Sequence, residues 1–180
     1  MALDPQEFLT TIKERFLFTQ EDIVILQTHA DWGKEIASAM ADHFYDYLTS
    51  DEEMNAILNA DEGRLQRLHQ TFISWFSDMF TGIDNWESAY AQSRWRIGIV
   101  HVKVGIGPQH VVPAMAKVIS EVGKLISKNN HPPELFTALN RICMIDLAFL
   151  EQAYVEVSSK AVLSETGWSE KLFKRLVSAG

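Results

Sequence analysis

The sequence predicts an all-α fold. Apolar residues recur every three or four positions along almost the whole chain, and no stretch alternates with the period of two that a β-strand needs. Clusters of Gly and Pro divide this pattern into segments of helical length. With 180 residues, 47% of them hydrophobic, the chain is long enough to bury a substantial core within one domain.

The first elements follow from their start and stop signals. An N-terminal extension helix is expected within residues 1–18, and Thr19 marks the next helix start because carboxylates follow it in the first turn. The later helices are expected where apolar side chains repeat: Ile36, Met40, Phe44 and Leu48; then Leu65, Leu68, Phe72, Phe76 and Met79, up to a stop at Gly82; then Trp86, Tyr90, Ile97, His101 and Val104, up to Gly105-Ile106-Gly107-Pro108.

Two long helices complete the predicted domain. One should begin after Pro108, run for about twenty residues and carry Pro113 in or just before its first turn. The other should run from about Glu134 to about Ser159. Its middle, residues 142–150, is apolar on nearly every face except at Asp146, so we expect it to pack on its own domain and on something else. Such an architecture suits either an up-and-down bundle or globin-like packing.

The overall composition excludes some classes of partner and site. Net charge is −8, which disfavours binding to nucleic acid or to an anionic membrane through a general electrostatic field. We find neither an apolar run of membrane-spanning length nor a secretory leader, so we expect a soluble, cytoplasmic protein. The single Cys143 excludes an internal disulfide and is expected to be a small buried hydrophobe.

The six histidines do not have the spacing of a zinc site, since neither His-Glu-x-x-His nor Cys-x-x-Cys occurs. Four of them lie beside polar residues or helix breakers and are expected to be solvent-exposed: His29, His43, His110 and His131. His101 differs because it lies on the apolar stripe of its helix. Spacing alone leaves two interpretations open, a core histidine with satisfied ring nitrogens or a ligand of a metal or haem iron.

A resemblance makes the second interpretation specific. The stretch Arg96-Ile97-Gly98-Ile99-Val100-His101-Val102-Lys103-Val104-Gly105-Ile106-Gly107-Pro108 resembles the F-helix motif of globin-coupled sensors and the related protoglobins. In that motif, two residues separate Ile-Gly from the histidine, and three separate the histidine from Gly-x-x-Pro. The resemblance implies a globin fold with long C-terminal G and H helices around a haem pocket. It also implies that His101 is the proximal ligand of a haem b, iron protoporphyrin IX.

Two further stretches agree with this family. His43-Phe44-Tyr45-Asp46-Tyr47-Leu48 is similar to its B-helix segment, whose tyrosine donates a hydrogen bond to bound oxygen, and Leu65 to Gly82 resembles its E helix, in which Thr71 takes the place of a ligand-supporting threonine. The resemblance covers roughly residues 15–158. It implies that the haem contacts are His101, Tyr45, Phe44, Leu68, Thr71, Leu48, Ile97, Val104 and Ile106. One departure is His110-Val111, where many members carry Trp-Tyr.

Helical spacing supports the two distal assignments. Tyr45 shares a stripe with Ala37, Ala41 and Leu48, and Thr71 shares one with Leu68 and Trp75, so both hydroxyls are expected to point inward. An inward hydroxyl usually has a partner. That partner is either a gas ligand in the pocket or a backbone carbonyl, which for Thr71 would be the one four residues earlier.

Three functions compete for such a domain. The first is a gas sensor in which ferrous haem binds O2, with CO and NO as other ligands, and the bound state is signalled onward. The second is a haem enzyme acting on O2 or NO, such as an NO dioxygenase, and the third is a haem-free interaction domain; a fold alone does not separate them. The sensor interpretation is favoured by the apolar last helix and the tail.

Domain organisation and assembly follow from the same interpretation. Residues 1–159 are expected to form the sensor globin domain. In residues 160–180, Ser164, Thr166 and Gly167 interrupt the apolar period before the stripe of Trp168, Leu172, Phe173 and Leu176, which suits a connector toward an output domain. Any enzymatic module would lie beyond residue 180. The apolar surface of residues 142–150 predicts a homodimer through the last two long helices.

Overall fold

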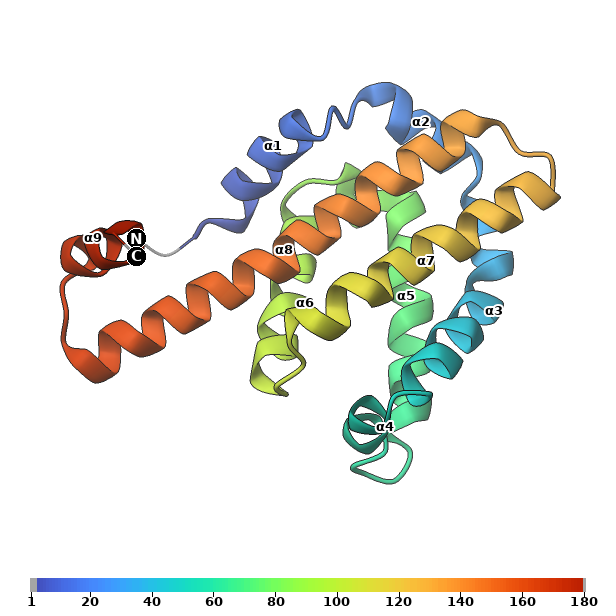
Figure 1. The fold of residues 1–180 in the computed structure, drawn as a ribbon. Coiled ribbons are helices and arrows are strands. Elements are labelled where there is room, and N and C mark those ends of the chain that lie inside the picture. The colour runs from blue at the N-terminus through green and yellow to red at the C-terminus, as the bar shows by residue number, and fades with distance from the viewer. Residues whose placement is uncertain (1–2, 180) are drawn as a thin grey trace.

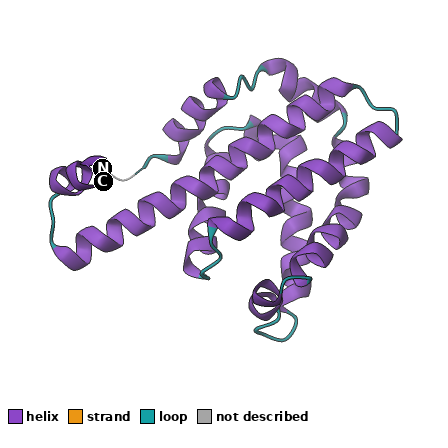
Figure 2. Cartoon of the chain, viewed as in Figure 1, coloured by secondary structure: helices purple, strands orange, loops and turns teal. Residues whose placement is uncertain are grey.

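The computed structural model describes residues 3–179, so Met1 and Ala2 of the expected extension and Gly180 of the expected tail lie outside it. Within this range the chain contains helices and no β-strand, which confirms the all-α prediction (Figure 2). The helices are α1 (Pro5–Arg15), α2 (Gln20–Thr28), α3 (Ala30–Thr49), α4 (Glu52–Leu58), α5 (Arg64–Asn85), α6 (Ser88–Lys103), α7 (Pro108–Lys128), α8 (Pro133–Thr166) and α9 (Glu170–Ala179).

The helices pack against one another across the whole molecule. Figure 1 shows α7 and α8 side by side along one face of the molecule, with α5 and α6 behind them. The closest helix pairs are α6 with α8, α3 with α5, and α7 with α8. No helix within residues 3–179 is both long and apolar enough to cross a membrane.

Local side-chain chemistry sets the helix starts as predicted. Thr19 caps α2 in a capping box, in which its hydroxyl accepts from Glu21 N–H and Asp22 Oδ2 accepts from Thr19 N–H at 2.7 Å. Gly107 precedes α7 and Pro108 occupies its first position, where a missing N–H is harmless. The four consecutive residues Gly105-Ile106-Gly107-Pro108 therefore account for the break between α6 and α7.

The predicted stop at Gly82 is also present. The backbone of α5 leaves helical geometry there, since Gly82 has φ 71°, and the element ends at Asn85. A Cβ at Gly82 would lie 2.4 Å from the Trp86 ring, so this corner requires glycine for space as well as for its left-handed backbone.

Two of the predicted helix positions were wrong. Pro113 does not lie in or before the first turn but inside α7, because Gly107 and Pro108 start that helix earlier than expected. The last helix does not end near Ser159. It continues to Thr166 and is terminated by Gly167 in the left-handed conformation, since the intervening serines are compatible with a helix.

The apolar middle of α8 is covered by the chain itself. Ile142, Ile145 and Phe149 are fully buried, because α6 and α7 pack on one part of the helix and α1 and α2 pack on another. The ring of Phe8 from α1 meets that of Phe149 edge-on with centroids 4.9 Å apart. Most of residues 142–150 are therefore covered within the protomer, whereas Met144 and Ala148 stay partly exposed. The two N-terminal helices, α1 and α2, supply the second packing surface.

Candidate functional site

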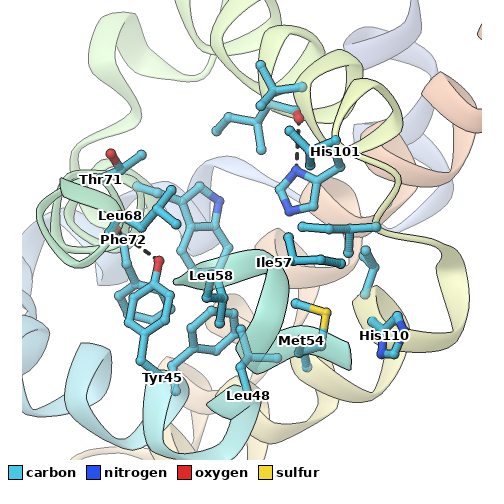
Figure 3. Close-up of a pocket in the computed structure, with 18 of the residues that line it drawn as sticks. Tyr45, Leu48, Met54, Ile57, Leu58, Leu68, Thr71, Phe72, His101 and His110 are labelled. Atoms are coloured by element: carbon cyan, nitrogen blue, oxygen red, sulfur yellow. Dashed lines mark hydrogen bonds between the residues drawn. The ribbon is translucent and has the colours of Figure 1, made fainter. Parts of the chain in front are cut away.

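A deep cavity lies between five helices. Side chains from α3, α4, α5, α6 and α7 form its walls (Figure 3). Leu150 of α8 also lines it. The lining atoms are mostly carbon. The residues that line it are Phe44, Tyr45, Leu48, Met54, Ile57, Leu58, Arg64, Leu68, Thr71, Phe72, Trp75, Ile97, Val100, His101, Val104, Ile106, His110, Val111, Ala114, Met115, Val118 and Leu150.

His101 presents one ring nitrogen to this cavity. It lies in the last turn of α6, and its ring points into the cavity (Figure 3). Nδ1 lies 2.9 Å from the carbonyl oxygen of Ile97. Because a carbonyl only accepts, Nδ1 carries the proton and Nε2 keeps its lone pair. Burial lowers the pKa of His101, and the bond to Ile97 only partly opposes this effect. The imidazole is therefore neutral at pH 7, as a metal ligand must be.

The two hydroxyls predicted on the distal side have backbone acceptors. Tyr45 Oη donates to the carbonyl oxygen of Leu68 at 2.9 Å, and Thr71 Oγ1 donates to that of Arg67, four residues earlier, at 3.0 Å. Both hydroxyls thus bond a backbone carbonyl, one of the two kinds of partner that the sequence leaves open. Thr71 is an exposed residue at the rim, whereas Tyr45 is half-buried. Burial raises the pKa of the Tyr45 phenol, so it is protonated and can donate a hydrogen bond at neutral pH.

The structure brings every residue of the predicted set to the same cavity. Phe44 and Leu48 join Tyr45 from α3, Leu68 and Thr71 come from α5, and the others lie on or just after α6. The ring of Phe44 packs on that of Phe72 with centroids 4.7 Å apart, which fixes α3 against α5 behind the cavity.

Sequence reasoning missed the short helix α4. Met54, Ile57 and Leu58 project from it into the cavity, beside the Tyr45 and Leu48 side chains of α3 (Figure 3). The signal was present, because these residues have the spacing of one helical face and Asp51 caps the helix by accepting from Met54 N–H at 2.9 Å.

His110 was predicted to be solvent-exposed, and this was wrong. Its side chain is only 14% exposed, lines the cavity from the first turn of α7, and bonds Glu53 Oε2 of α4 through Nε2 at 3.1 Å. His29 and His131 are also partly buried, with ring centroids 5.1 Å apart, whereas His43 is exposed as expected. Helix packing between α4 and α7 buries His110, and no local sequence signal reports that packing.

A buried ionic network stands directly behind the cavity wall. Trp75 lines the cavity, and its indole Nε1 donates to Asp146 Oδ2 at 2.9 Å. Asp146 also accepts from Arg94 Nε at 3.0 Å and from Tyr90 Oη at 2.7 Å. Burial alone would lower the pKa of Arg94, but Asp146, Tyr90 and Asp78 together outweigh that effect and raise it, so Arg94 stays a cation. The sequence identified Asp146 only as the polar residue within the apolar stretch 142–150, and it did not predict its partners.

The donor set of this cavity fits a haem. One neutral imidazole nitrogen faces a cavity whose walls are otherwise almost entirely apolar and, within residues 3–179, contain no carboxylate. A porphyrin needs apolar contact over both faces, and haem iron needs one axial base on its proximal side. Cys143 takes no part, since its thiol is buried against Met79 away from the cavity and burial raises its pKa.

Comparisons with known proteins agree with this geometry. The family model described as Protoglobin matches residues 6–160. Among solved structures, the chain is similar to the globin domain of the Geobacter sulfurreducens globin-coupled sensor, with 30% sequence identity, 81% of this chain and 96% of that chain covered, and a TM-score of 0.73. No curated protein matches the chain by sequence.

Proposed function

This chain belongs to the protoglobin family, and on that premise we propose that it is a haem-based O2 sensor domain with His101 as the axial ligand of a haem b. Membership of a globin family implies a haem cofactor. When bound, ferrous haem supplies an iron atom that binds O2 reversibly. The observation that carries the proposal is the His101 imidazole, which is neutral, directed into an apolar cavity, and bonded through Nδ1 to the Ile97 carbonyl.

The Ile97 carbonyl has a defined role in this proposal. It fixes the tautomer and the orientation of the ring, as partners of metal-bound histidines do in other sites. Because the acceptor is four residues earlier on α6, the ring and the helix move as one unit. Non-covalent attachment is supported by the sequence, which lacks Cys-x-x-Cys-His.

On the opposite wall, Tyr45 is the proposed main donor to O2 and Thr71 a secondary one. The phenol of Tyr45 is held at the cavity by Leu68, and a carbonyl inside α5 is already part of the helical hydrogen-bond ladder. The phenol can therefore rotate from this carbonyl to a ligand and leave no unpaired acceptor behind. Thr71 starts from an exposed position, which makes its contribution smaller.

Signalling would use the contact between α6 and α8. Gly98 lies one turn before His101 and faces Ala153, and a Cβ at Gly98 would lie 2.8 Å from Ala153 Cβ. Because no side chain larger than a methyl group separates the two helices at this point, a shift of α6 would act directly on α8. We propose that the signal passes through a homodimer formed by α7 and α8. Residues 160–180 would act as the connector to an output domain; this connector begins inside the last turns of α8 and includes α9. The half-exposed outer stripe of α8, which includes Met144 and Ala148, supports the dimer.

The test is the absorption spectrum of the purified protein in its ferric, ferrous and oxygenated forms, with the pyridine haemochrome yield. The parent should show one haem b per chain and a reversible oxygenated spectrum. His101→Ala should keep its helical content and lose the normal Soret band, whereas the matched control His43→Ala, an exposed histidine of α3, should keep it. An unchanged Soret band and haem yield in His101→Ala would reject the assignment.

A further inference from the structure

The ionisable side chains of the cavity wall are unevenly distributed. Apart from His101 and the phenol of Tyr45, the wall holds two, Arg64 at the first position of α5 and His110 in the first turn of α7. Among the residues that the structure describes, no Asp or Glu belongs to the wall. An anion inside the cavity would therefore meet favourable charge at the N-terminal ends of α5 and α7, beside α4, and carbon elsewhere.

Haem has a matching asymmetry. Its two propionate carboxylates lie on one edge of the ring, and the rest of its perimeter is hydrocarbon. A carboxylate in an apolar cavity loses hydration and needs a charged donor in exchange. Resting on the proposed haem function, we infer that Arg64 binds a haem propionate, so that the carboxylate edge faces the start of α5.

Arg64 suits this role because its present ion pair is weak. Its Nη1 lies 3.7 Å from Oδ2 of Asp61, whose side chain is 71% exposed, and such a pair contributes little to stability. The Arg64 side chain itself is only 23% exposed. A guanidinium is charged at every relevant pH and its fork of N–H donors matches both oxygens of a carboxylate, so a propionate displaces Asp61 readily.

His110 is the weaker partner for a propionate. Its Nε2 is already bonded to Glu53 Oε2 at 3.1 Å, and its charge depends on protonation. A propionate placed on His110 would bring a second carboxylate next to Glu53, which is unfavourable at neutral pH. His110 and Glu53 instead tie α7 to α4 at the edge of the cavity.

The experiment compares Arg64→Gln with Arg67→Gln, a matched control one turn later on α5. Arg67 is exposed, donates from Nη1 to the Glu62 carbonyl at 3.2 Å, and does not line the cavity. Each protein is loaded either with ferric protohaem or with its dimethyl ester, which lacks free carboxylates. Release to excess apomyoglobin is then followed in the Soret band.

We expect Arg64→Gln to release protohaem about tenfold faster than the parent, the ratio that corresponds to about 1.4 kcal/mol of binding free energy. It should release the dimethyl ester at the parent rate, and Arg67→Gln should match the parent with both. Equal release of protohaem from Arg64→Gln and parent would overturn the inference, as would equal acceleration for the ester. A parent that binds no haem would reject the proposed function itself, and this inference with it.

Discussion

The indole Nε1 of Trp75 donates to Oδ2 of Asp146 at 2.9 Å, which joins one wall of the cavity to the middle of α8. Trp75 is bound a second time, because Arg94 donates from Nη2 to its backbone carbonyl at 3.1 Å. Three helices thus meet at one carboxylate that is 2% exposed. The ring that would touch a haem is therefore fixed by a contact to α8, and the backbone that carries it by a contact to α6.

Asp146→Ala should destabilise the protein by about 3–5 kcal/mol, because it leaves the buried Arg94 guanidinium without its main counter-charge. Urea unfolding of the haem-free protein measures the loss. Asp78→Ala is the matched control. Asp78 also accepts from Arg94, at 3.2 Å, but its side chain is 30% exposed, so its removal should lower the free energy of unfolding by about 1 kcal/mol or less. Equal losses for the two variants would contradict this assignment of the buried pair.

Tyr45→Phe should raise the O2 dissociation rate about tenfold. A hydrogen bond to a ligand with partial negative charge contributes roughly 1.5–3 kcal/mol, and the phenol gives up about 0.5–1.5 kcal/mol in leaving the Leu68 carbonyl. Flash photolysis and stopped-flow mixing measure the rates. Carbon monoxide is less polar, so its dissociation should change much less. Equal effects on both gases would mean that Tyr45 shapes the cavity and does not donate to the ligand.

Gly98→Ala should destabilise the protein by about 1–3 kcal/mol, because the new Cβ would meet both Ala153 Cβ and, at 3.1 Å, the backbone oxygen of Phe149. Helix propensity alone predicts the opposite sign, a gain of about 1 kcal/mol. Gly123→Ala is the matched control on α7, since its new Cβ would meet the partly exposed Phe136 ring, which can move aside. Thermal unfolding measures the stability of both variants. A Gly98→Ala protein more stable than the parent would refute the close contact between α6 and α8.

Met144→Glu and Val155→Glu should weaken the proposed homodimer, as measured by light scattering at micromolar concentration. Val155 is 59% exposed, so the single protomer tolerates a charge there. Met144 is half-buried and also packs on the core, so the helical content of its variant is measured beside the dimer. Val24→Glu, on the exposed side of α2, is the control. Leu147 and Phe149 would be poor choices, because both are buried within the protomer. A monomeric parent protein would end the dimer proposal.

Removal of residues 168–180 should leave haem retention and O2 affinity unchanged. The residues that line the cavity run from Phe44 to Leu150, and no residue of α9 is buried. A cut after Gly167 preserves the end of α8, and a second cut after Ser159 removes its last two turns. Soret titration and O2 equilibrium curves compare the three proteins. Substantial haem loss in the shorter forms would show that the tail helps to close the cavity and is not a connector.

The sequence by itself determined the all-α class, several helix ends and the apolar face of α6 on which His101 lies. Some residues act only on the backbone within a few positions, so their effect can be predicted without knowledge of the fold. They are Thr19 with Asp22, Gly82, and Gly107 with Pro108. The hydrogen bond from His101 to Ile97 spans one helical turn and is local for the same reason. This locality is why the all-α class and the position of His101 could be derived from the pattern and the resemblance.

Tertiary structure alone decided the contacts between distant segments. The bond from Tyr45 to Leu68 spans 23 residues, that from His110 to Glu53 spans 57, and that from Trp75 to Asp146 spans 71. Each of these bonds depends on how two helices cross, and apolar periodicity does not encode that crossing. An apolar stripe predicts that a helix face is buried, but it does not predict which side chains that face contacts. The acceptor of the Tyr45 phenol, the burial of His110 and the carboxylate behind Trp75 were therefore beyond the sequence, because packing selects partners only after the helices have formed.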